Sequence, residues 1–173
     1  MSTTLTAIRV DDKTTFYSEL CLQLTALIDG EPDAIAQLAN ASALLAEHLE
    51  DINWVGFYLL KSGGLVVGPF QGRVACTRIA TGRGVCGTAV ARGRSIVVDD
   101  VEAFADHIAC DSASRSEVVV PLRDRSGAIV GVLDVDSPLL ARFDDEDRDG
   151  LERVAAVLAL AVDFRAAGCD QAP

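Results

Sequence analysis

The stretch from residue 117 to residue 136 reads EVVVPLRDRSGAIVGVLDVD. Two apolar, β-branched segments, Glu117–Leu122 and Ala128–Asp136, flank the polar, glycine-containing segment Arg123–Gly127. β-Branched residues favour strands, and a short polar segment with glycine is typical of a turn between paired strands. The stretch therefore predicts an antiparallel β-hairpin.

A second hairpin is predicted upstream of the first. Ile52–Leu60 and Leu65–Phe70 are again apolar, β-branched and aromatic, and Lys61–Gly64 between them has turn chemistry. Further upstream, two segments have apolar residues at helical spacing and predict two amphipathic helices. These residues are Phe16, Leu20, Leu24 and Leu27 in the first segment, and Ile35, Leu38, Leu45 and Leu49 in the second.

The downstream end predicts one more helix, which begins after Phe143. Its first residues, Asp144–Asp147, are acidic and complement the positive end of the helix dipole. The middle region, Gln71–Ser116, predicts a short helix and the strand Ser95–Val98 between glycine-containing loops. Helices first, antiparallel hairpins in the middle and a helix last indicate the α+β class, with helices packed against an antiparallel sheet.

Length and charge limit the domain organisation and the partners. The 173 residues fit one domain spanning residues 1–173, with a frayed tail from about residue 166. Lys and Arg number 15 against 26 Asp and Glu, and the resulting net charge of −11 repels nucleic acids and anionic membranes. No apolar run approaches the roughly 20 residues that span a bilayer. We expect a soluble, cytoplasmic protein that binds neither nucleic acid nor membrane.

The five cysteines are the first candidates for chemistry. Cys21 lies in a helical segment and is predicted to be a small core residue, and Cys169 an exposed tail thiol. Cys76, Cys86 and Cys110 lie in polar or glycine-containing stretches and are predicted to be loop thiols. The chain has no Cys-x-x-Cys spacing, which would have indicated a disulfide framework or a metal site. A thiolate at such positions is the reactive species in redox or nucleophilic sulfur chemistry.

Carboxyl groups and aromatic rings are the second set of candidates. Side chains an even number of residues apart in a strand share a face, so Asp134 lies on the same face as Asp136, and Trp54 on the same face as Tyr58. The two pairs could line one pocket. Glu117 begins a buried strand, where desolvation would raise its pKa and make it a proton donor. The alternatives are exposed strand ends for the acids and ordinary core positions for the aromatic pair.

Two other kinds of site stay open at this point. His107 and the three loop cysteines could bind zinc, although their spacing is not that of a zinc site. Cys110 with His107 as base could form a hydrolase site, although three residues of separation do not establish contact. The segment Gly82–Gly87 lacks the full order of a phosphate-binding loop and predicts a tight turn.

Five segments together resemble the free methionine-(R)-sulfoxide reductases, which are enzymes built on a single GAF domain. These segments are residues 53–58 (NWVGFY), 68–72 (GPFQG), 82–89 (GRGVCGTA), 107–111 (HIACD) and 133–137 (LDVDS). The resemblance extends from about the first helix to the last. It implies a central antiparallel sheet of about six strands flanked by helices, and a homodimer.

The resemblance also implies roles for particular residues. Cys110 matches the nucleophile and Cys76 the resolving cysteine, with Cys86 as a further candidate for resolution. Glu117, Asp134 and Asp136 match acidic positions that bind substrate, with Glu117 as proton donor, and Trp54 and Tyr58 match the aromatic wall at the methyl end.

The implied reaction is the reduction of free L-methionine-(R)-sulfoxide to methionine, a response to oxidative stress. Cys110 would become a sulfenic acid and then form an intramolecular, redox-active disulfide, with thioredoxin as the external reductant and with no bound cofactor or metal. The alternative is a noncatalytic GAF small-molecule or redox sensor, because fold alone does not fix function.

Overall fold

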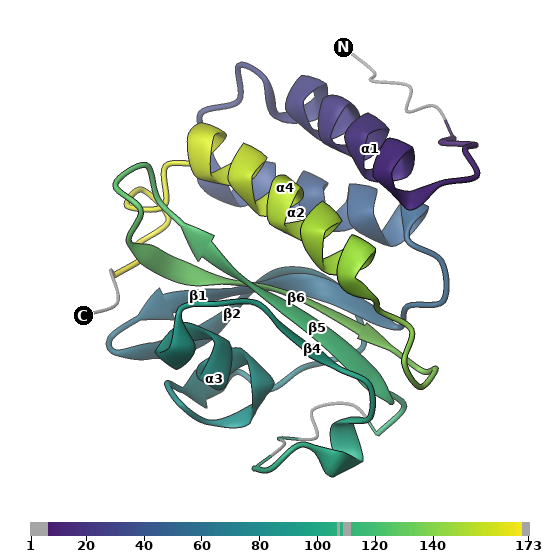
Figure 1. Cartoon of the computed structure of the whole chain (residues 1–173). Coiled ribbons are helices and arrows are strands. Elements are labelled where there is room, and N and C mark those ends of the chain that lie inside the picture. Colours follow the sequence, from purple (N-terminus) through teal and green to yellow (C-terminus); the bar gives the residue numbers. More distant parts are fainter. Residues whose placement is uncertain (1–6, 107, 109–111, 171–173) are drawn as a thin grey trace.

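The computed structural model describes residues 7–106, 108 and 112–170 (Figure 1). Within them a six-stranded antiparallel sheet has the strand order β3-β2-β1-β6-β5-β4 and is accompanied by four α-helices. The elements are α1 Lys13–Ile28, α2 Ala34–His48, β1 Trp54–Lys61, β2 Gly64–Gly72, β3 Arg78–Ala80, α3 Gly84–Arg92, β4 Ile96–Val98, the 3-10 turn η1 Val101–Ala103, β5 Ser116–Arg123, β6 Ile129–Ser137 and α4 Asp145–Ala161. The predicted α+β class and antiparallel sheet are confirmed.

Helices cover both faces of the sheet unequally. Figure 1 shows α1, α2 and α4 on one face and α3 on the other. Strand residues therefore divide by parity: Val55, Phe57 and Leu59 of β1 belong to the core beneath the three helices. Trp54, Tyr58 and Leu60 belong to a second core beneath α3. Burial on both faces explains why these strands are almost continuously apolar.

The register of the central strands gathers the polar residues of the α3 face. Between β1 and β6, Trp54 pairs with Asp136 and Gly56 with Asp134. Between β5 and β6, Glu117 pairs with Asp136. Because directly paired residues of antiparallel strands point to the same face, the three acids and the aromatic residues share one surface.

Capping and buried hydrogen bonds stabilise the start of α4, in addition to the helix dipole. Asp144 and Asp147 form a reciprocal capping box. Asp147 is also buried, and its carboxylate accepts hydrogen bonds from Tyr17 Oη at 2.9 Å, Lys13 Nζ at 2.6 Å and Arg142 Nη1 at 3.1 Å. A buried carboxylate needs such partners, so this group ties α1 to α4.

The expected positions of two cysteines were wrong, and one strand was missed. Cys86 lies in the first turn of α3 and not in a loop, because the turn predicted at Gly82–Gly87 leads into the helix at Gly84. The short edge strand β3 was not predicted at all. Cys169 is half-buried against the larger core and not exposed.

The described part of the tail is attached to the sheet and not frayed, because the Asp170 amide donates to Leu60 O at 2.7 Å. Among the described residues, no helix has the length and apolar character needed to cross a membrane.

Candidate active site

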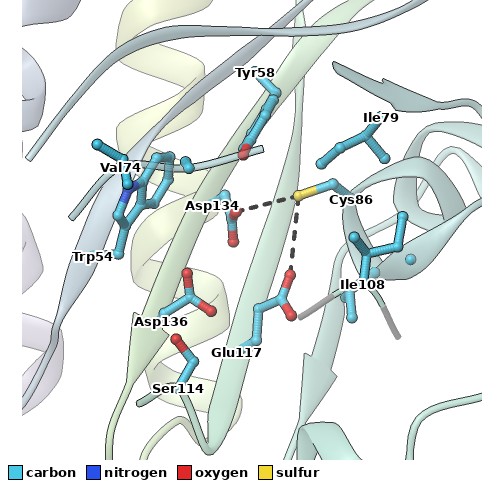
Figure 2. Close-up of a pocket in the computed structure, with 13 residues that line it drawn as sticks. Trp54, Tyr58, Val74, Ile79, Cys86, Ile108, Ser114, Glu117, Asp134 and Asp136 are labelled. Carbon is cyan, nitrogen blue, oxygen red and sulfur yellow. Dashed lines mark hydrogen bonds between the residues drawn. The ribbon is translucent and has the colours of Figure 1, made fainter. Parts of the chain in front are cut away.

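A pocket of about 520 Å³, its mouth included, opens on the α3 face of the sheet. The structure brings most of the predicted site residues into its wall (Figure 2). They are Trp54 and Tyr58 from β1, Cys86 from α3, Glu117 from β5, and Asp134 and Asp136 from β6. Apolar walls with a few converging polar groups are typical of small-molecule sites.

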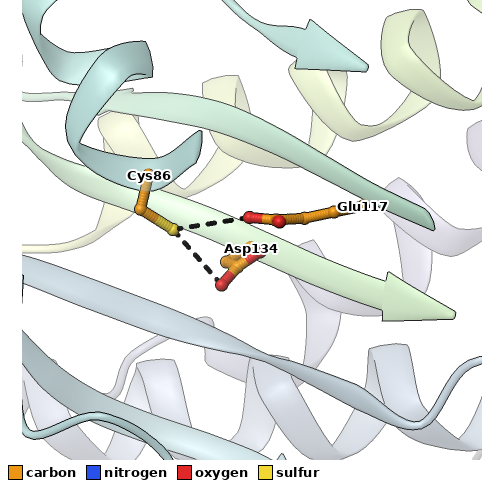
Figure 3. A group of neighbouring side chains, drawn as sticks. All are labelled: Cys86, Glu117 and Asp134. Atoms are coloured by element: carbon orange, nitrogen blue, oxygen red, sulfur yellow. Dashed lines mark hydrogen bonds between the residues drawn. The ribbon is translucent and has the colours of Figure 1, made fainter. Parts of the chain in front are cut away.

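Cys86, Glu117 and Asp134, which all line this pocket, form a buried cluster (Figure 3). Their exposed fractions are 3%, 6% and 5%. The Cys86 thiol donates to Asp134 Oδ2 at 3.3 Å and approaches Glu117 Oε1 at 3.9 Å. Asp134 Oδ1 accepts no hydrogen bond from any described residue. A buried carboxylate oxygen without a donor is costly, which makes this atom available to a ligand.

Burial is the largest cause of the pKa shifts in this cluster. It raises the pKa of Glu117 well above its ordinary value, and the neighbouring charge of Asp134 raises it further. Burial also raises the pKa of Asp134, to about 7, although hydrogen bonds from Cys86 and Glu117 oppose this. The pKa of Cys86 is raised well above 9, first by burial and then by Asp134. Near neutral pH the empty site therefore holds Glu117 as a carboxylic acid and Cys86 as a thiol.

The aromatic wall depends on residues that the sequence analysis did not identify. The Trp54 ring stacks on Tyr58 and on Phe70, with centroid distances of 5.8 and 5.2 Å. Gly56, between the two aromatic residues on the same face of β1, makes this possible. A Cβ at Gly56 would lie 2.3 Å from Phe70 Cβ and 2.8 Å from the Trp54 ring. The pattern Trp-x-Gly-x-Tyr was the available signal for this arrangement.

The cysteines are in different states. Cys76 is half-buried and disulfide-bonded. Cys21, Cys86 and Cys169 are free thiols. The predicted nucleophile Cys110 and its neighbour His107 lie outside the described residues. The structure thus distinguishes the two candidates for resolution, Cys76 and Cys86, by their bonding and by their surroundings.

One group in the described part of the chain could hold a metal ion. The donor atoms of Cys86, Glu117 and Asp134 lie within 4.8 Å of one another. A cation there would have to displace protons from groups whose pKa values are raised. The zinc alternative built on His107 and three cysteines requires thiolates, and Cys76 is bound in a disulfide.

Comparison with known proteins identifies this combination of fold and pocket. The GAF domain family matches residues 33–162, so the chain is a GAF-domain protein. It is 55% identical over 147 residues to the free methionine-R-sulfoxide reductase of Escherichia coli, covering 85% of this chain and 88% of that protein. The Saccharomyces cerevisiae enzyme of the same name is 38% identical, with 85% and 86% covered. The chain belongs to the free methionine-R-sulfoxide reductase family, a family of oxidoreductases.

The fold of a solved relative agrees with this assignment. The X-ray structure of free methionine-R-sulfoxide reductase from Neisseria meningitidis in complex with its substrate is similar to this chain with a TM-score of 0.85. The two sequences are 48% identical, and the match covers 92% of this chain and 95% of the other.

Proposed function

We propose that this protein reduces free L-methionine-(R)-sulfoxide to L-methionine. The observation that carries the proposal is a single pocket that joins a buried acidic cluster to an aromatic wall, in a chain whose relatives bear the name of this activity. The substrate has a matching polarity, with an ammonium group at one end and a methyl sulfoxide at the other.

The acidic side of the pocket binds the substrate ammonium. Asp134 and Asp136 lie on one face of β6, and Asp134 Oδ1 accepts no hydrogen bond from a described residue. A bound cation would favour the ionised form of the buried Asp134 and offset the desolvation that raises the pKa of this carboxyl. A methionine sulfoxide within a protein chain has no ammonium to present. This difference gives the pocket a physical reason to prefer the free amino acid.

The first chemical step transfers oxygen to the protein. The Cys110 thiolate attacks the sulfoxide sulfur while the Glu117 carboxyl donates a proton to the sulfoxide oxygen. The protonated oxygen then passes as a hydroxyl group to the Cys110 sulfur, which becomes a sulfenic acid, and the sulfur–sulfur bond made by the attack breaks to release methionine. Glu117 suits the role of donor because its raised pKa keeps it protonated near neutral pH.

The second step forms a disulfide. The Cys76 thiolate attacks the sulfenic sulfur of Cys110, a sulfur–sulfur bond forms, and the hydroxyl group leaves as water after taking up a proton. Cys76 is a better candidate for this step than Cys86. Cys76 is disulfide-bonded, whereas Cys86 is a thiol whose pKa is raised by burial and by Asp134, so little thiolate is present.

The remaining parts of the proposal concern the cellular setting. Thioredoxin, as an external dithiol, opens the disulfide for the next turnover, and the protein acts as a homodimer in the cytoplasm, where thiols are kept reduced. The alternative is a noncatalytic GAF sensor that uses the same pocket or the same disulfide. Repeated turnover with a regenerating reductant separates the enzyme from the sensor.

The experiment compares free methionine-(R)-sulfoxide with its N-acetyl derivative, which lacks the ammonium. Wild type should prefer the free amino acid, and the Asp134→Asn, Asp136→Asn double variant should lose about 10- to 100-fold in kcat/KM for it, as expected for a lost charge-assisted hydrogen bond. The ratio of kcat/KM for the free amino acid to kcat/KM for the N-acetyl derivative should fall by the same factor in the double variant. Asp29→Asn, at an exposed acid after α1, is the matched control. Unchanged kcat/KM in the double variant would show that the acids do not bind the ammonium.

A further inference from the structure

The loop between β2 and β3, residues 73–77, belongs both to the pocket and to the proposed recycling chemistry. It carries Cys76, which packs against the core beneath α3. Val74 and Ala75 of the same loop line the pocket, and Val74 is 88% exposed in the empty protein. The position of this loop therefore decides where the resolving sulfur lies relative to the substrate site.

The aromatic wall supplies two hydrogen bonds to the backbone of this loop. Trp54 Nε1 donates to Arg73 O at 3.2 Å, and Tyr58 Oη donates to Cys76 O at 3.1 Å. A third bond, from Val67 N to Thr77 O at 3.1 Å, holds the loop where it approaches β3. Side chains of the central strand β1 thus fix both ends of the segment that contains Cys76.

The two donors are themselves rigidly held. Trp54 and Tyr58 stand on a strand that is paired on both sides, with β2 and with β6. The Trp54 ring stacks on both Tyr58 and Phe70. Tyr58 is only 2% exposed, and burial raises its pKa, so its hydroxyl remains protonated and able to donate. Hydrogen bonds to such rigid donors fix the positions of the loop carbonyl groups that accept them.

We propose that Tyr58, assisted by Trp54, is a positioning residue for disulfide formation by Cys76, in addition to forming the pocket wall. This inference rests on the proposed function, because it concerns the second step of that reaction. There the Cys76 thiolate displaces the hydroxyl group from the sulfenic sulfur. Such an attack depends strongly on the placement of the attacking sulfur.

The variant Tyr58→Phe isolates this role. It keeps the ring, the stacking on Trp54 and the apolar wall, and it removes only the hydroxyl that holds Cys76 O. Because Tyr58 also lines the pocket, the rate of disulfide formation is compared with the rate of methionine formation in the same variant. Disulfide formation should slow about fivefold, the change in rate that corresponds to one ordinary hydrogen bond.

The experiment mixes pre-reduced protein with one equivalent of free L-methionine-(R)-sulfoxide and no reductant. Quenched samples are analysed for methionine, for sulfenic acid trapped with dimedone, and for remaining thiols. In Tyr58→Phe, disulfide formation should slow relative to methionine formation, so that more sulfenic acid accumulates than in wild type. Disulfide formation at the wild-type rate, or equal slowing of both steps, would overturn the inference.

Tyr17→Phe is the matched control, because Tyr17 is also a buried tyrosine, but its hydroxyl donates to Asp147 between α1 and α4. It should alter neither step. Hydrogen exchange of the reduced proteins gives a reading independent of catalysis: amides of residues 73–77 should exchange faster in Tyr58→Phe than in wild type and Tyr17→Phe. If wild type yields no methionine, the proposed function is wrong and exchange alone decides whether Tyr58 holds the loop. Unchanged exchange would overturn the inference.

Discussion

Asp134→Asn should stabilise the empty protein at neutral pH, although it removes a group proposed to bind substrate. Burial raises the pKa of Asp134 from about 3.8 to about 7. The folded protein therefore binds this proton more tightly than the unfolded chain. The resulting stabilisation is complete below about pH 4 and is lost as the pH rises to about 7. At about 1.4 kcal/mol for each pH unit, the full loss is about 4 kcal/mol.

Asparagine does not titrate, so the variant should not suffer this loss. Local rearrangement and water entry reduce such costs, and we expect a net gain of about 2 kcal/mol over wild type at pH 7.5 and little difference at pH 4.5. Urea unfolding without reductant, at half-unit pH intervals, measures this difference. Asp29→Asn, which changes an exposed acid outside the pocket, is the control. Two results would contradict a raised pKa at Asp134. One is that the free energies of unfolding of wild type and Asp134→Asn change with pH in parallel, and the other is that the variant is less stable than wild type at pH 7.5.

Further predictions concern packing and the proposed reaction. Gly56→Ala should cost about 1–3 kcal/mol of stability and change the near-ultraviolet signal of Trp54, because the added Cβ overlaps the aromatic stack; a wild-type spectrum and stability would count against that packing. Glu117→Gln should lower kcat/KM about 100-fold. In steady-state assays, the wild-type rate should fall as the pH rises through the raised pKa of Glu117. This fall should be absent from the pH–rate profile of Glu117→Gln. Cys76→Ser should release about one methionine per protein and then stop, whereas Cys86→Ser should turn over repeatedly within a fewfold of wild type. Arrest of Cys86→Ser after one turnover would make Cys86 the resolving thiol instead.

The sequence predicted the elements whose signal is local. Apolar, β-branched segments on either side of short polar turns located both hairpins, and the period-two rule placed Asp134 with Asp136 and Trp54 with Tyr58 on shared faces. The raised pKa of Glu117 also followed from its place at the start of a buried strand. These expectations hold because strand periodicity and burial are properties of neighbouring residues.

Features that depend on tertiary contacts could not be predicted in this way. The glycines of the segment at 82–87 indicated a turn, but packing against the sheet lets a helix begin there and places Cys86 beside two acids. The sequence of the tail gave no signal for order, yet its Asp170 amide donates a hydrogen bond to Leu60 O near the end of β1. The role of Gly56 becomes visible only when Phe70 on the neighbouring strand is in place.

The central claim is that the pocket reduces the free R sulfoxide. Its most direct test is steady-state turnover of free L-methionine-(R)-sulfoxide, beside the S epimer and a peptide-bound sulfoxide, with a thioredoxin recycling system and Cys110→Ser as control. Selective turnover of the free R epimer that vanishes in Cys110→Ser is the predicted result. Binding of the free sulfoxide by reduced wild type without any methionine formed would contradict the account and favour a sensor.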